Sequence, residues 1–172
     1  MFHLCTEEEI LDRLERKERS ITHLDKLSYL NAFYLRFLAN YKGLEITPDI
    51  VIFGYEEALE ENRYLADIFP DISAVLWKIG RTGQGDEWFM HKEDGNMLFY
   101  NHDEGEYSSA INFQNLKISF FNFLQMAFLY QDLENLLNEN DDEIEESDKV
   151  DFKERINAIQ PGLYQLYPFQ YF

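Results

Sequence analysis

A glycine-rich segment, Gly80-Arg81-Thr82-Gly83-Gln84-Gly85, contains the residue types that cradle phosphate groups. Its spacing differs from that of a nucleotide-binding loop, because no lysine follows the last glycine. Asp86 and Glu87 come next and would repel a phosphate. A strand is expected after them, where a phosphate site needs the N-terminus of a helix. The segment therefore predicts a flexible β-turn.

Two histidines, His91 and His102, are expected near the ends of paired strands, close in sequence to Asp86, Glu87 and Asp103. These residue types can ligate a metal ion, but the tight ligand spacing of motifs such as HExxH or CxxC is absent. We therefore interpret both histidines as exposed residues at strand ends beside acids. The sequence predicts no metal site and no cofactor.

Carboxylates and Cys5 are the remaining candidates for catalysis. One hypothesis is a carboxylate-dependent hydrolase in which Trp77 and Trp88 line a sugar cleft. Large aromatic residues at strand spacing, however, more often pack in a core. Cys5 has His3 close to it, but a nucleophilic cysteine needs a basic neighbourhood, and we expect both residues on a frayed N-terminus. The sequence therefore predicts no catalytic residue and no enzyme.

The charge of the chain is its strongest functional signal. Of its 172 residues, 33 are Asp or Glu and 15 are Lys or Arg, which gives a net charge of −18. Direct binding of nucleic acid is not expected, because it needs Lys and Arg to replace counterions. A basic protein partner is favoured, since long-range attraction speeds encounter, although the charge also serves ordinary solubility.

Other features of the composition favour a protein of the cytoplasm. A single cysteine allows no internal disulfide, which fits a reducing compartment. The N-terminal apolar stretch is too short for a signal peptide, and no run approaches the ~18 apolar residues of a membrane span. We therefore expect no contact with a membrane.

Hydrophobic spacing predicts the elements that position these residues. A capping box formed by Thr6 and Glu9 starts a helix over 6–19, and Gly43 is expected as the C-cap of a helix over 26–42. The remaining expected helices are 118–138 and a short one over 152–159. Strands are expected over 50–53, 74–79, 87–91 and 97–102, with a turn at Gly95, and 56–69 is ambiguous but begins in a helical pattern.

This order predicts a single α+β domain, in which helices pack on one face of an antiparallel β-meander. We expect its core over about 26–138. An acidic segment over 139–151, with eight acids and one lysine, is predicted to be solvated and mobile. The aromatic extension over 152–172 is expected either to bury within the domain or to form a homodimer contact.

Four pieces of the chain resemble the SUKH superfamily, which includes the SMI/KNR-type domain. They are the helix YLRFLANYKG at 34–43, the block WKIG…GDEWF at 77–89, the strand MLFY at 97–100 with His102 and Asp103, and Asn112-Phe113 leading into FFNFL at 120–124. The likeness covers roughly 26–137 and follows the helix, meander and closing-helix order of that superfamily.

The resemblance implies a bacterial immunity protein, which binds a cognate toxin and blocks it without chemistry. A nuclease domain with a basic surface is the expected toxin, and a regulatory interaction scaffold is the alternative. Expected contacts are the acids and one aromatic residue near the turns of the sheet, with Trp88 either an anchor or a core residue: Asp86, Glu87, Trp88, Glu93, Asp94, Asp103, Glu104 and Glu106.

Overall fold

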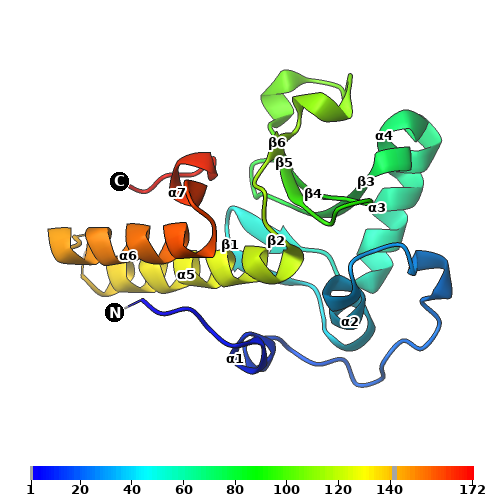
Figure 1. Ribbon diagram of the computed structural model, residues 1–172. Coiled ribbons are helices and arrows are strands. Elements are labelled where there is room, and N and C mark those ends of the chain that lie inside the picture. Colours follow the sequence, from blue (N-terminus) through cyan, green and yellow to red (C-terminus); the bar gives the residue numbers. More distant parts are fainter. Residues whose placement is uncertain (1, 141–142) are drawn as a thin grey trace.

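The computed structural model describes residues 2–140 and 143–172, and within them the chain folds as a mixed α+β protein (Figure 1). Its sheet has six strands in the order β1-β2-β3-β4-β5-β6, and every neighbouring pair is antiparallel. The predicted α+β meander is therefore confirmed. The strands are β1 (Leu44–Thr47), β2 (Ile50–Ile52), β3 (Leu76–Arg81), β4 (Glu87–His91), β5 (Met97–Tyr100) and β6 (Gln114–Asn115).

The helices are distributed before, within and after the meander. The α-helices are α1 (Glu7–Asp12), α2 (Ala32–Asn40), α3 (Tyr55–Ile68), α4 (Pro70–Val75), α5 (Phe120–Glu139), α6 (Glu146–Ile159) and α7 (Leu163–Leu166). Short 3-10 turns are η1 (Asp25–Leu27), η2 (His102–Glu104) and η3 (Ala110–Asn112). Over the described part of the chain, none of these helices has the length and apolar character needed to cross a bilayer.

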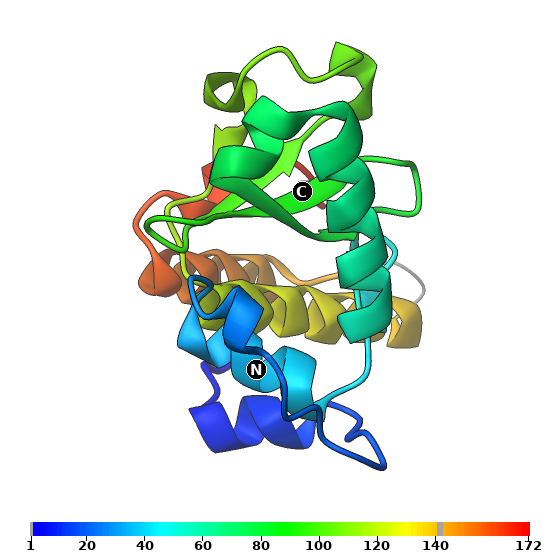
Figure 2. The same cartoon turned by 90° about the vertical axis from the view of Figure 1, so that its right-hand side faces the viewer.

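Helices cover both faces of the sheet, which corrects the expectation of a single covered face (Figure 2). Side chains alternate along each strand, so neighbouring residues point to opposite faces. Trp77 and Trp88 belong to the larger core, with α2 and α5, while Leu76 and Phe89 belong to a smaller core with residues of α3 and α4. The central strands are consequently apolar on both sides.

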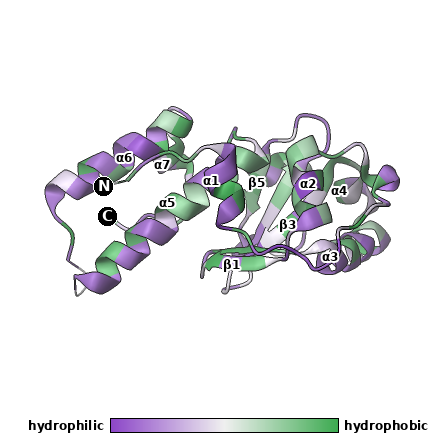
Figure 3. Ribbon diagram, turned by 90° about the horizontal axis from the view of Figure 1, so that it is seen from below, coloured by the Kyte–Doolittle hydropathy of each residue, from purple (hydrophilic) through white to green (hydrophobic). Residues whose placement is uncertain are grey.

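The aromatic C-terminus completes the larger core. Tyr167 lies parallel to Trp88 with ring centroids 6.2 Å apart, and Phe169 meets Phe99 edge-on at 5.4 Å. Tyr130 of α5 contacts the Tyr167 ring at 4.2 Å. The extension therefore takes the first of its two expected roles, burial within the domain. Hydrophobic residues of α5 gather where it meets the sheet, and its far end and α6 are more hydrophilic (Figure 3).

Two expected helices are shorter than predicted. The capping box of Thr6 and Glu9 is present, but α1 ends at Asp12. The helix expected over 26–42 is divided, because the Asn31 side chain accepts hydrogen bonds from the Phe33 and Tyr34 amides and caps α2 there. Gly43 does not cap α2; a Cβ there would collide with the backbone of Gly54.

The strand expected over 74–79 begins at Leu76, because Pro70 opens α4, which includes residues 74 and 75. The ambiguous segment after residue 55 is the helix α3. Strands β1 and β6 lie at the two edges of the sheet and were not predicted, since each is short and lacks a clear alternating pattern. Helix α6 begins at Glu146, inside the predicted acidic segment; residues 141 and 142 of that segment lie outside the described residues.

The glycine-rich segment, predicted as a flexible β-turn, is divided: Gly80 and Arg81 belong to β3, and residues 82–86 form a tight connection to β4. The Thr82 amide donates to the Asp86 carbonyl at 2.8 Å, and the Asp86 amide donates to the Thr82 hydroxyl at 3.0 Å. Gly80 lies within β3, where a Cβ would collide with the Val51 carbonyl oxygen. Gly95 has φ of 73° in the next turn, which explains the choice of glycine there.

Candidate functional site

The eight residues expected to contact a partner lie at two opposite ends of the β4–β5 hairpin. Glu93 and Asp94 are exposed in the turn that joins the two strands. The other six lie at the far end, where β4 begins and the chain leaves β5. The two histidines are separated in the same way, so His91 and His102 do not form a common site.

Two of these eight residues are corrected by their burial. Trp88 is 0% exposed and donates its indole N–H to the Asp49 carbonyl at 2.8 Å, so it is a core residue and not a surface anchor. Asp86 is 5% exposed, and its carboxylate accepts hydrogen bonds from the Thr82 hydroxyl and the His102 amide. Asp86 therefore holds two loops together. The acids that remain exposed at this end are Asp103, Glu104 and Glu106.

The Asp86 carboxylate also fixes the exposed imidazole of His102. The His102 Nδ1 lies 2.6 Å from Asp86 Oδ1, and its Nε2 lies 3.3 Å from Asp103 Oδ1. The hydrogen bond to Asp86 raises the pKa of His102, and the charge of Asp103 adds to this effect, while the loss of hydration partly opposes it. The contact between His102 and Asp86 therefore fixes the loop after β5, which carries the exposed acids.

A groove opens beside this loop, on the face of the sheet that α3 covers. We call it the α3 groove; its volume is about 270 Å³, and its lining comprises Glu61, Tyr64, Leu65, Phe69, Lys78, Glu87 and Tyr107. Lys78 and Glu87 reach it because alternation on β3 and β4 places them on the same face as Leu76 and Phe89. A second hollow, of about 420 Å³, adjoins it and shares Phe69 and Tyr107 with it.

Lys78 is the polar centre of the α3 groove. Its ammonium group lies 2.8 Å from Glu61 Oε2 and also pairs with Glu87, whose other oxygen accepts the Tyr107 hydroxyl. Burial lowers the pKa of Lys78, but Glu87 and Glu61 outweigh it, so that the pKa is raised. Burial, and then the bond to Glu87, raises the pKa of Tyr107. Both shifts favour the protonated forms of these two groups.

Glu61, Lys78 and Tyr107 were not predicted as site residues. They lie on α3, on β3 and in the loop after β5. The signal that was present is Lys78 itself, because a lysine in the middle of an apolar strand needs a buried anionic partner. Which acids supply that partner depends on the packing of α3 against β3.

The cleft required by the hydrolase hypothesis is not formed by the two tryptophans. Trp77 is buried and donates its indole N–H to the Tyr34 hydroxyl at 3.0 Å, and Trp88 is enclosed by Phe99, Phe123 and Tyr167. Both rings are buried within the larger core. A sugar ring has no access to the space between them.

Comparison with known protein families, with characterised proteins and with solved structures gives no match to this chain. The likeness to the SUKH superfamily therefore stays a prediction, which depends on the residues quoted for it.

Proposed function

We propose that this protein is a non-enzymatic immunity protein of the cytoplasm, which binds and neutralises a toxin with a basic surface, such as a nuclease domain. The observation that carries the proposal is the combination, on one side of the molecule, of exposed apolar residues with exposed acids. Tyr64 is 63% exposed and Ile68 is 53% exposed, and both line the hollows beside α3.

Exposed acids lie on the same helices as these apolar residues and on the neighbouring loop. On α3 and at the start of α4 they outnumber the one exposed basic residue, Arg63: they are Glu56, Glu57, Glu60, Asp67 and Asp71. The loop after β5 adds Asp103, Glu104 and Glu106. Aromatic anchors within a polar rim are typical of protein interfaces, and a rim of one charge favours a partner of the opposite charge.

The α3 groove is also ordered before any partner binds. Tyr100 donates its hydroxyl to the Gly105 and Glu106 carbonyls at 3.3 and 3.2 Å, which ties the acidic loop to β5. Phe69 and Tyr107 pack edge-to-face at 4.8 Å. A preformed surface loses little conformational entropy on binding, and it therefore suits tight inhibition.

The test is co-expression with a basic toxin domain encoded beside this gene, followed by measurement of growth and of binding at several salt concentrations. We expect protection, and an association rate that falls as salt screens the attraction. Tyr64→Ala should weaken binding by tenfold or more, whereas Tyr29→Ala, which changes an exposed tyrosine elsewhere, should not.

A matched pair of charge variants separates local from overall charge. The triple variant Asp103→Asn, Glu104→Gln, Glu106→Gln should slow association, because these acids lie beside the α3 groove. The control triple Glu143→Gln, Glu145→Gln, Glu154→Gln removes the same charge from exposed positions near and on α6. This interface would be rejected if the two triple variants slowed association equally, or if the association rate did not depend on salt concentration. Specific binding of a protein other than a toxin, without protection against the toxin, would favour the scaffold alternative.

A further inference from the structure

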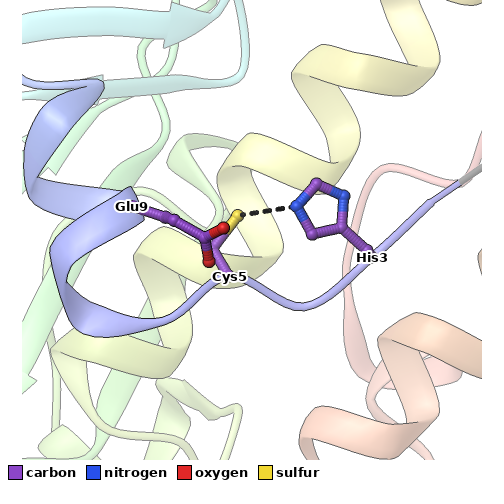
Figure 4. Close-up of side chains that lie close together, drawn as sticks. All are labelled: His3, Cys5 and Glu9. Carbon is purple, nitrogen blue, oxygen red and sulfur yellow. Dashed lines mark hydrogen bonds between the residues drawn. The ribbon is translucent and has the colours of Figure 1, made fainter.

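Three side chains of different ligand chemistry meet at the N-terminal arm (Figure 4). His3 Nε2 lies 3.8 Å from Cys5 Sγ, and one ligand atom from each of His3, Cys5 and Glu9 lies within 4.8 Å of the other two. We call these three residues the N-terminal cluster. It lies outside the α3 groove, and the proposed immunity function does not use it.

The arm that carries His3 and Cys5 is fixed to the domain, contrary to the expectation of a frayed terminus. Phe2 is buried against Phe152, with ring centroids 5.1 Å apart, and its amide donates to Asp151 at 3.0 Å. The Cys5 backbone forms two hydrogen bonds with the Gln125 side chain of α5: its amide donates to Oε1, and its carbonyl accepts from Nε2, both at 2.8 Å.

Glu9 is held by the capping box of α1. Its Oε2 accepts the Thr6 amide at 2.7 Å, while the Thr6 hydroxyl accepts the Glu9 amide at 3.3 Å. This cap uses one carboxylate oxygen and leaves Oε1 for another partner. The backbone is thus restrained on both sides of the cluster, by Phe2 and Gln125 before it and by the cap after it. A ligand that joins the three side chains would meet little further entropy loss.

The spacing suits a tetrahedral metal ion. With zinc–sulfur and zinc–nitrogen bonds of about 2.3 and 2.0 Å, the sulfur and nitrogen atoms of a tetrahedral site lie about 3.5 Å apart. The observed Cys5–His3 distance of 3.8 Å is slightly longer than that value, and the exposed His3 side chain can rotate to shorten it. A ligand atom of Glu9 already lies within 4.8 Å of both, with the capping box formed. Thiolate, imidazole and carboxylate are all ordinary zinc ligands.

We propose that His3, Cys5 and Glu9 bind one Zn²⁺ ion, with water as the fourth ligand. Three protein ligands and one open position are the arrangement of exchangeable or reactive zinc sites, whereas structural sites have four protein ligands. The ion would connect the N-terminal arm to the first helix. Because the ligands lie within seven residues of one another, zinc binding does not require any other part of the fold to move.

The charged groups near the N-terminal cluster are compatible with a bound metal cation. Arg13 is the nearby cation, and it is paired with Asp132 at 2.7 Å and bonded to Gln131 at 2.8 Å. Burial raises the pKa of Cys5, and Arg13 partly opposes this. The thiol must therefore lose its proton to the solvent when the metal–sulfur bond forms, so zinc affinity should increase with pH.

The test is titration of the full-length protein with Zn²⁺, and separately with Co²⁺ as a spectroscopic substitute. We expect one equivalent to bind, with thiolate-to-cobalt charge transfer in the near ultraviolet and visible bands of a tetrahedral ion, both abolished by Zn²⁺. Cys5→Ser, His3→Gln and Glu9→Gln should each weaken Zn²⁺ binding at least tenfold. Glu9→Gln keeps an oxygen that can accept the Thr6 amide, so α1 remains capped.

The controls separate this site from weak binding to the many surface acids. His23→Gln removes an exposed histidine outside the cluster and should leave the affinity unchanged. Zn²⁺ should also protect Cys5 from a thiol reagent in the unmodified protein. The proposal is overturned if Co²⁺ gives no charge-transfer band, if Cys5→Ser binds Zn²⁺ as tightly as the parent, or if His23→Gln loses as much affinity as His3→Gln. Circular dichroism of each variant verifies that its fold is intact.

Discussion

Replacing Lys78 by methionine tests whether the charge network of the α3 groove is structural. Methionine retains the packing of the aliphatic stem, so the main loss is the positive charge between Glu61 and Glu87. The Lys78 side chain is 13% exposed and that of Glu87 is 18% exposed. Glu87 would therefore be left as a nearly buried anion without its cation.

The magnitude follows from this partial burial. Removing one partner of a fully buried ion pair costs about 3–5 kcal/mol, because the other charge stays buried and unpaired. The Tyr107 hydroxyl still bonds to Glu87 in the variant, and water reaches both carboxylates to some extent. We therefore expect Lys78→Met to lower the free energy of unfolding by about 2–3 kcal/mol at pH 7.

Urea denaturation, followed by tryptophan fluorescence, measures this change. The double variant Lys78→Met, Glu87→Gln should recover about 1–2 kcal/mol, since it no longer buries an unpaired carboxylate.

Lys42→Met is the matched control, because Lys42 pairs with Glu15 at a site where both side chains are well exposed. It should change the free energy of unfolding by no more than the error of the measurement. Two results would refute the reasoning: equal effects of Lys78→Met and Lys42→Met, or a double variant that is as unstable as the sum of its single changes.

Three further changes test the core, the sheet and the loop after β5. Trp88→Ala should lower the free energy of unfolding by about 3–5 kcal/mol in urea denaturation, because it leaves a cavity among Phe99, Phe123 and Tyr167. Gly80→Ala should cost about 1–3 kcal/mol, since its Cβ meets the Val51 carbonyl oxygen within the β2–β3 pair. Asp86→Asn should lower the pKa of His102 towards its ordinary value, which NMR titration of the imidazole measures.

The raised pKa of His102 also predicts the sign of a pH effect. A protonated histidine that is stabilised in the folded protein contributes stability below its unfolded pKa of about 6.5, and this contribution is lost as the pH rises through the folded value. Asp86→Asn should remove that dependence. The contacts assigned to Trp88 and Gly80 would be contradicted if Trp88→Ala or Gly80→Ala left the free energy of unfolding nearly unchanged. The contact between Asp86 and His102 would be contradicted if Asp86→Asn left the pKa of His102 unchanged.

Local patterns in the sequence were sufficient for the central part of the fold. Alternating apolar residues and turn glycines predicted β4, β5 and the Gly95 turn, and the apolar spacing predicted α5 to within two residues at each end. These features depend on neighbours in the chain, whose influence is visible in the sequence. Edge strands β1 and β6 were missed because their pairing partners, not their own residues, make them strands.

The surface was harder to predict, because burial depends on contacts between distant segments. Asp86 and Trp88 belong to a stretch that looks like a binding surface, yet the loop after β5 covers the first and the C-terminal aromatic residues cover the second. Glu61, Lys78 and Tyr107 meet only because α3 packs on β3. The N-terminal cluster forms because Gln125 holds Cys5 across a separation of 120 residues.

The amino-acid sequence by itself determined the class of fold, the acidic charge and the antiparallel order of the central strands, since hydrophobic period and turn chemistry act over a few residues. Tertiary structure alone decided which charged and aromatic groups reach the surface. A side chain is exposed or buried according to what packs against it, and the segments that cover Asp86, Trp88 and Cys5 come from distant parts of the chain.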